Sequence, residues 1–208
     1  MPFDFKKEFK NLYSPSDKPE IILVPPMNFL AVYGKGDPNR EGGEYKQAVE
    51  LLYGAAYTIK TSPKNNYNIE GFFDYVVPPL EGLWQSPNAD LVNKDELSWI
   101  SLIRLPNFVK ESDIQRAKAF AAQKKKKDFS SVEFFCYDEG LCVQCLHIGP
   151  YDDEPQTIEK MKTFAKEQGY IIDITPARYH HEIYLSNPNN TEPSKLKTII
   201  KLPIKKSI

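Results

Sequence analysis

The 208-residue chain has few cysteines and histidines, three of each, and no hydrophobic run near the ~20 residues of a transmembrane helix. It also lacks a charge excess, since 27 basic residues nearly balance 28 acidic ones. Proteins that bind nucleic acids or membrane surfaces usually carry a clear basic excess. We therefore expect no nucleic-acid partner and no membrane partner.

The N-terminus lacks the hydrophobic core of a signal peptide, because residues 1–13 mix charged and aromatic side chains. Residues 1–18 are also too few for a DNA-binding helix-turn-helix and a linker, which excludes a fused transcription regulator. These features predict a cytoplasmic protein, and we expect a monomer or weak dimer. A chain of this length is long enough to bury a hydrophobic core.

The cysteine spacing does not predict a metal or redox site. Cys142 and Cys145 spell CxxC, but they fall in a predicted strand, where residues three apart face opposite sides. Adjacent His180 and His181 face opposite sides for the same reason. We interpret the cysteines as small buried hydrophobic residues and predict no metal and no cofactor.

Short hydrophobic strands and amphipathic helices make up most of the chain. We predict helices over residues 44–60 and 111–123 and a third that begins near Asp152 or Asp153. Strands are predicted over residues 21–24, 29–33, 72–77, 80–84, 99–105, 132–136, 141–148, 180–185 and 197–203. Asp138-Glu139-Gly140 predicts a hairpin between two of these strands.

The order of strand, Gly-containing turn, helix, strand and strand occurs twice. FLAVYGKGDPN precedes the first long helix and CVQCLHIGPYDD precedes the third, which indicates an internal duplication. We divide the chain into an N-terminal extension (1–18), a first half-module (19–95) and a second half-module (96–208). Two such modules predict an α+β fold, with an antiparallel sheet, helices on one face and a ligand cleft between the halves.

The segment HHEIYL, residues 180–185, places a carboxylate in the middle of a predicted strand. His180, Glu182 and Tyr184 share one face, which we predict to lie opposite the helices, while Ile183 and Leu185 mark the core side. A carboxylate centred on a sheet face is costly unless it is solvated, paired or used. An ordinary solvated outer face is the alternative interpretation. Aromatic residues that can join this face are Trp84, Trp99, Tyr75, Phe73 and Tyr137.

Several segments together resemble the GyrI-like small-molecule-binding family. They are LLYGAAYTIK, VVPPLEGLW, DEGLCVQCLHIGPYDDEPQTIEKM, and HHEIYLSNP followed by KLKTIIKLPIK, and the N-terminal segment looks like the stand-alone branch. The resemblance covers essentially the whole chain. It implies a cleft lined by aromatic residues with a central acidic residue, which matches Glu182. Trp84 and Tyr184 match aromatic positions, Tyr53 and Tyr57 are further candidates, and Gln85 stands where many members have a second Trp.

The resemblance implies two functions. Relatives fused to DNA-binding heads sense lipophilic cations and other drugs, and some stand-alone relatives resemble hydrolases that open cyclopropane rings in DNA-alkylating natural products. An aromatic slot with a carboxylate suits flat or cationic guests, and the same carboxylate can activate a water molecule. We therefore predict a multidrug-type binding protein, with a detoxifying hydrolase as the alternative. A third hypothesis is a protein that binds another protein through an acidic face.

The predicted site follows from these hypotheses. Glu182 and Tyr184 are the candidates for catalysis. The candidates for ligand binding are Trp84, Trp99, Tyr137, Tyr57, Tyr53, Phe73 and His180. By contrast, His147 shares a strand face with hydrophobic residues, and we predict a hydrogen-bonded core histidine there.

Overall fold

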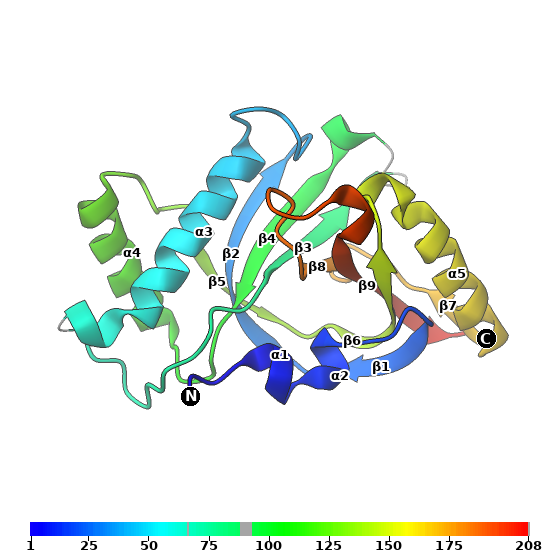
Figure 1. Ribbon diagram of the computed structural model, residues 1–208, viewed down its shortest axis with the longest axis horizontal. Helices are drawn as coiled ribbons and strands as arrows, with labels where there is room; N and C mark the ends of the chain where they lie inside the picture. Colours follow the sequence, from blue (N-terminus) through cyan, green and yellow to red (C-terminus); the bar gives the residue numbers. More distant parts are fainter. Residues whose placement is uncertain (66, 88–92, 208) are drawn as a thin grey trace.

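The computed structural model describes residues 1–65, 67–87 and 93–207, and these form an α+β fold around a nine-stranded antiparallel sheet (Figure 1). The strands are β1 (Glu20–Val24), β2 (Met27–Lys35), β3 (Leu80–Gln85), β4 (Ser98–Arg104), β5 (Glu133–Tyr137), β6 (Gly140–Ile148), β7 (Tyr170–Ile172), β8 (His180–Tyr184) and β9 (Lys197–Lys206). The helices are α1 (Phe5–Glu8), α2 (Lys10–Tyr13), α3 (Glu44–Lys60), α4 (Glu111–Lys125) and α5 (Glu154–Glu167). The predicted fold class is confirmed.

The internal duplication appears as two copies of a strand-helix-strand-strand unit. The first copy is β2-α3-β3-β4 and the second is β6-α5-β8-β9. Their strands pair in the same order, β2-β4-β3 and β6-β9-β8, and the copies meet where β3 pairs with β8. Strand pairing therefore assigns β4 to the first copy, although the predicted boundary between the two half-modules lies before β4, after residue 95.

The strand predicted over residues 72–77 is wrong, because this segment makes only an isolated bridge between Phe3 and Tyr75. Its backbone bonds to the N-terminal segment, with Phe3 N donating to Asp74 O and Val76 N donating to Phe3 O. Two prolines follow at positions 78 and 79 and lack the N–H groups that a sheet ladder needs. The strand that completes the first copy is β4.

The hairpin predicted at Asp138-Glu139-Gly140 is also wrong. β5 pairs with β2, while β6 pairs with β1 and β9. Gly140 has the positive φ of 69° expected at a turn, but it sits opposite Val24 beside the Pro25-Pro26 interruption. The connection from β1 to β2 and the connection from β5 to β6 bend at the same level, and the strands on each side of the bend are paired. The bend thus links the two ends of the sheet.

The sheet has covered surfaces on both sides. On one side, which we call the helix face, α3 and α4 pack on the first copy and α5 on the second (Figure 1). The hydrophobic stripe of α3 is buried, at Ala48, Leu52, Ala55 and Ile59. On the other side, the reverse face, α1 and α2 of the N-terminal extension cover part of the sheet.

The prediction of buried cysteines is confirmed for Cys142 and Cys145 and is wrong for Cys136, which is exposed at the end of the sheet formed by β5. Cys142 packs on the reverse face and Cys145 packs under α5 on the helix face, and both are buried free thiols. None of the helices in the described ranges is long and apolar enough to cross a membrane.

A buried charged cluster lies on the reverse face around His181. Its Nδ1 lies 3.0 Å from Glu139 Oε1 and its Nε2 lies 2.9 Å from Glu81 Oε2. Ionised carboxylates only accept hydrogen bonds, so both ring nitrogens donate when both acids are ionised. Burial lowers the pKa of His181, but Glu139 and Glu81 outweigh it and raise the pKa to about 9. The same partnership holds the pKa of Glu139 at about 2 despite its burial.

This cluster also anchors the N-terminal extension. The Tyr13 hydroxyl donates to Glu81 Oε1 at 3.1 Å, and Arg104 Nη1 donates to the Tyr13 oxygen at 3.4 Å. The Arg104 guanidinium lies over the rings of Phe5 and Phe9, 4.8 and 4.4 Å from their centroids. Cation–π contacts and charge-assisted hydrogen bonds therefore join the extension to the sheet.

We predict that the free energy of unfolding falls as the pH rises through about 9. The unfolded chain loses the His181 proton near the ordinary pKa of 6.5, whereas the folded protein keeps it up to about pH 9. The stabilising contribution of His181 is therefore complete below pH 6.5 and is lost as the pH rises from 6.5 to about 9. His181→Gln should flatten this dependence and cost about 3–5 kcal/mol at neutral pH, because two buried carboxylates lose the imidazolium that bonds to both of them. Urea denaturation across the pH range measures both effects.

His147→Gln is the matched control, because His147 is buried but bonds to the Thr157 hydroxyl and the Pro150 carbonyl instead of carboxylates. That variant should keep the alkaline loss of stability. A wild-type protein whose stability is flat up to pH ~10 would contradict the imidazolium assignment.

Candidate functional site

A connected polar network surrounds Glu182 in the middle of β8. Glu182 Oε1 lies 2.9 Å from His180 Nε2, and Oε2 accepts from the Tyr184 hydroxyl at 2.6 Å. Trp84 Nε1 on β3 donates to the same hydroxyl at 3.0 Å. Glu182 is only 8% exposed, so its charge is held by neighbouring donors more than by water. The alternative of a solvated outer face is therefore wrong.

The predicted orientation of this face is also wrong. Glu182 shares the helix face with Trp84 and Trp99, which pack against Ala48 and Leu52 of α3. Alternation along the strand gave the correct grouping of residues, but both faces of the sheet are buried. Hydrophobic neighbours such as Ile183 therefore do not mark the helix side, and Ile183 packs on the reverse face.

The pairing of β3 with β8 places these groups together. Glu182 is the cross-strand partner of Gly82, and His180 is the partner of Trp84. A Cβ atom at Gly82 would lie 2.6 Å from Trp84 Nε1 and 3.0 Å from the Tyr184 hydroxyl. Because Gly82 has no side chain, there is room above it for the hydrogen bond between Trp84 Nε1 and the Tyr184 hydroxyl.

Two further tyrosines extend the aromatic wall that Trp84, Trp99 and Tyr184 form. The Tyr45 ring, from the first turn of α3, lies 5.5 Å from the Trp84 ring and 5.1 Å from the Trp99 ring. The Tyr151 ring, just before α5, meets the Tyr184 ring edge-on at 6.0 Å. The sequence analysis missed both, because it placed the helices on the other side of the sheet.

A second carboxyl group, Glu154, completes the site. It is the first residue of α5 and is 7% exposed, and its Oε1 atom has no hydrogen-bond partner among the described residues. Burial and the Glu182 charge raise the pKa of Glu154 well above its ordinary value. Burial also raises the pKa of Glu182, but the hydrogen bonds with His180 and Tyr184 and the interaction with His180 outweigh it and hold that pKa below its ordinary value. Sequence reasoning missed Glu154, since an acid in a helix's first turn is common.

The structure places the other predicted site residues away from Glu182. Tyr137 is on the reverse face, stacked on Phe135 and in edge contact with Tyr179. Tyr53 and Tyr57 stack on each other along α3, and Tyr57 is 54% exposed. The structure therefore gathers Glu182, Tyr184, His180, Trp84 and Trp99 and leaves these three apart.

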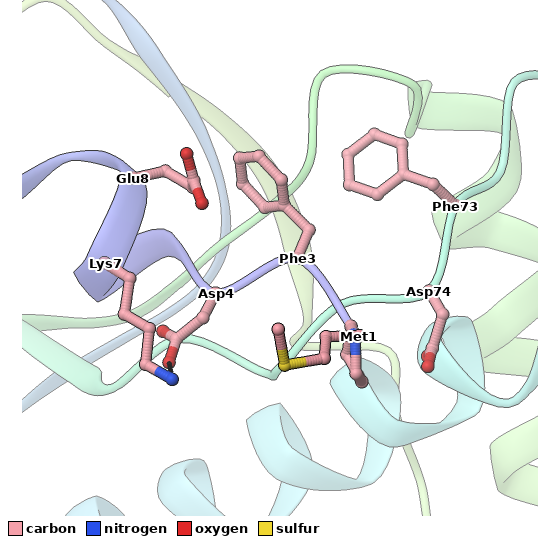
Figure 2. Close-up of a pocket in the computed structure, with 8 residues that line it drawn as sticks. Met1, Phe3, Asp4, Lys7, Glu8, Phe73 and Asp74 are labelled. Atoms are coloured by element: carbon pink, nitrogen blue, oxygen red, sulfur yellow. Dashed lines mark ion pairs between the residues drawn. The ribbon is translucent and has the colours of Figure 1, made fainter.

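Phe73 lines a hollow of about 620 Å³ beside the N-terminus, where its ring lies 5.3 Å from that of Phe3 (Figure 2). Another hollow, of about 320 Å³, is lined on the reverse face by residues that include Tyr33, Gln85 and Tyr179. Glu182 belongs to neither hollow. Within the described part of the chain, no group of three or more His, Cys, Asp or Glu side chains is arranged to hold a metal ion.

Comparison with known proteins identifies the family. A sequence model of the GyrI-like small molecule binding domain matches residues 17–205. The chain belongs to this family. None of the curated proteins matches the chain.

Solved structures from Listeria innocua are similar to this chain over nearly its whole length. One is described as a hydrolase, with 45% identity, a TM-score of 0.90, and coverage of 98% of this chain and 100% of the relative. The other is described as an uncharacterized conserved protein, with 47% identity, a TM-score of 0.92 and the same coverage. The EcmrR C-terminal domain shares the fold at 11% identity and a TM-score of 0.57, covering 91% of this chain and 98% of that domain.

We predict that Gly82→Ala disrupts the site. The added methyl group would crowd Trp84 Nε1 and the Tyr184 hydroxyl, and we expect a loss of about 1–3 kcal/mol in the free energy of unfolding. Tryptophan fluorescence reports the change directly, because the chain has two tryptophans and both lie in this wall. Tyr184→Phe is the comparison variant, since it removes the hydrogen bond without crowding. A Gly82→Ala protein with wild-type stability and fluorescence would contradict the close packing.

Proposed function

We propose that this GyrI-like protein binds hydrophobic small molecules of aromatic or cationic character beside Glu182. The observation that carries the proposal is the buried Glu182 carboxylate, which accepts a hydrogen bond from Tyr184 beside Trp84. Ring faces attract flat and cationic groups, and a carboxylate in a low-dielectric environment strengthens that attraction. A multidrug-binding role in the cytoplasm is part of this proposal.

Two buried polar atoms in this region support a ligand-binding role. Among the described residues, neither Trp99 Nε1 nor Glu154 Oε1 has a hydrogen-bond partner. Such orphaned atoms are rare in native proteins and are costly unless something satisfies them. A bound molecule with a polar substituent can supply those partners.

Tyr151 is the most exposed ring of the aromatic wall beside Glu182. It is 38% exposed and covers Tyr184, whereas Trp84 and Trp99 are 5% and 2% exposed. We propose that a guest displaces the Tyr151 ring and stacks against Tyr184 and Trp84. Binding by displacement of a ring is consistent with the absence of Glu182 from both hollows described above.

A second candidate function is hydrolysis of an electrophilic cyclopropane. The Listeria innocua relative described as a hydrolase is 45% identical over nearly the whole chain, and a carboxylate beside a second carboxyl group suits acid–base chemistry. In this reaction Glu182 accepts a proton from water as the water oxygen bonds to a ring carbon and a ring C–C bond breaks. The electron pair of that bond moves into a carbonyl conjugated with the ring, whose oxygen is then protonated as Glu182 releases its proton, so that the net change is the addition of one water. Tyr184, which donates to Glu182, holds the carboxylate in place.

The binding proposal is tested with a fluorescent aromatic cation such as rhodamine 6G, by fluorescence polarisation. Glu182→Gln should weaken its binding by about tenfold or more, because a desolvated charge pair is lost, while a neutral aromatic guest of similar size binds almost unchanged. Glu167→Gln, an exposed position at the end of α5, is the matched control. Equal affinity of the wild-type and Glu182→Gln proteins for the cation would contradict the proposal.

Hydrolysis is tested with a cyclopropane-bearing DNA-alkylating agent, by following the mass increase of one water. If the protein is a hydrolase, Glu182→Gln should lower turnover by at least about 100-fold while the neutral substrate still binds. Tight binding by the wild-type protein without any product would reject hydrolysis and retain the binding function.

A further inference from the structure

We propose that Lys201, Glu139 and Gln144 form a second buried binding site, on the reverse face of the sheet, and that its ligand is a single water molecule. The site is separate from the Glu182 network, because Lys201 is the cross-strand partner of His181, which faces away from Glu182. The inference goes beyond the proposed function and does not depend on it.

The first observation is a lysine amine in the interior of the protein. Lys201 on β9 is 0% exposed, and its Nζ atom has no hydrogen-bond partner among the described residues. An ammonium group has three N–H donors and no acceptor, and its burial is unfavourable unless those donors are satisfied. A buried polar group without a partner in the chain points to a bound water or ion.

Two acceptor atoms without a hydrogen bond belong to residues next to this lysine. Gln144 on β6 is the cross-strand partner of Lys201, and its Oε1 atom is buried and unpaired within the described ranges. On the other side, His181 is paired with Lys201, and Glu139 bonds to His181 through Oε1. The Oε2 atom of Glu139 is likewise buried and unpaired. Paired residues have Cβ atoms about 4.5–5.5 Å apart on one face, so Lys201 stands between the two acceptors.

Glu139 and Lys201 are close enough for their charges to interact without a direct hydrogen bond. Burial raises the pKa of Glu139, but the charges of His181 and Lys201 lower it. Neither Lys201 Nζ nor Glu139 Oε2 has a direct partner in the part of the chain that the structure describes. A group that lies between the two atoms and bonds to both accounts for this arrangement.

The amide of Gln144 is held in a fixed orientation. Its Nε2 atom donates to the Asn11 carbonyl and to Glu20 Oε1, both at 2.8 Å. These bonds use both donors of the amide nitrogen. The Oε1 atom therefore remains as an acceptor that needs a donor.

The three unpaired atoms select the chemical class of the ligand. It must accept a hydrogen bond from an ammonium group and donate one to a carboxylate oxygen and one to an amide oxygen. Water has two donors and two acceptor lone pairs, and a buried water typically makes about three hydrogen bonds. The Lys201 charge would repel a metal cation, and the Glu139 charge would repel an anion such as phosphate.

The N-terminal extension closes the site and limits it to a small ligand. Its helix α2 supplies the Asn11 carbonyl that holds Gln144, and the neighbouring Leu12 and Tyr13 are 2% and 3% exposed. The Tyr13 hydroxyl also donates to Glu81 Oε1 at 3.1 Å, which fastens α2 to the sheet. A water molecule under this cover is expected to exchange slowly with solvent.

A high-resolution crystal structure of the wild-type protein tests the proposal without any variant. We expect one water molecule within about 3.2 Å of Lys201 Nζ, Glu139 Oε2 and Gln144 Oε1. A direct bond between Lys201 Nζ and Glu139 Oε2 with no water, or a metal ion or larger ligand at this position, would overturn the proposal. This measurement decides the question even if a Lys201 variant does not fold.

NMR of the lysine ammonium groups tests the same site in solution. A buried Lys201 ammonium should exchange its protons slowly enough to give a nitrogen-15 signal, with a nuclear Overhauser contact to a bound water. Lys201→Met should remove this signal and so assign it. Lys206→Met, at an exposed position on the same strand, is the matched control and should retain it. A wild-type spectrum without the signal, or a Lys201 signal without a contact to water, would contradict the proposal.

Discussion

The structure depends on the short pairing of β3 with β8, because this pair joins the two copies of the duplicated unit. Its register sets Glu182 against Gly82 and His180 against Trp84. The strand alternation then sends consecutive residues of β8 to opposite faces. Glu182 reaches the helix face and His181 reaches the reverse face, so two buried polar networks lie back to back across a single strand pair.

The two networks satisfy buried carboxylates in different ways. On the reverse face, a cationic His181 lies between Glu81 and Glu139 and bonds to both, and the network ties the N-terminal extension to the sheet through Tyr13. On the helix face, Glu182 is held by hydrogen-bond donors, with no fixed Lys or Arg ion pair among the described residues. A paired charge stabilises the fold, whereas a charge held by such donors remains available to a cationic guest.

Much of the fold could be predicted from periodicity, but the orientation of the site could not. The helix over residues 44–60, the duplication and the shared face of His180, Glu182 and Tyr184 all followed from sequence patterns. Alternation does not identify which face the helices cover when both faces are buried. Residues 138–140 form a bend where their sequence predicts a turn, but this bend lies beside Pro25-Pro26 of the neighbouring segment. β5 and β6 therefore pair with β2 and β1 instead of with each other. Glu154 was missed because Glu182, whose charge raises its pKa, comes from a distant strand.

A crystal structure of the protein with a bound aromatic cation tests the central claim most directly. The account predicts that the cation lies in contact with the Glu182 carboxylate, stacks on Trp84 or Tyr184, and has displaced the Tyr151 ring. A cation bound in the hollow beside Phe73, or in the one beside Tyr33 and Tyr179, with the Glu182 network unchanged, would contradict it.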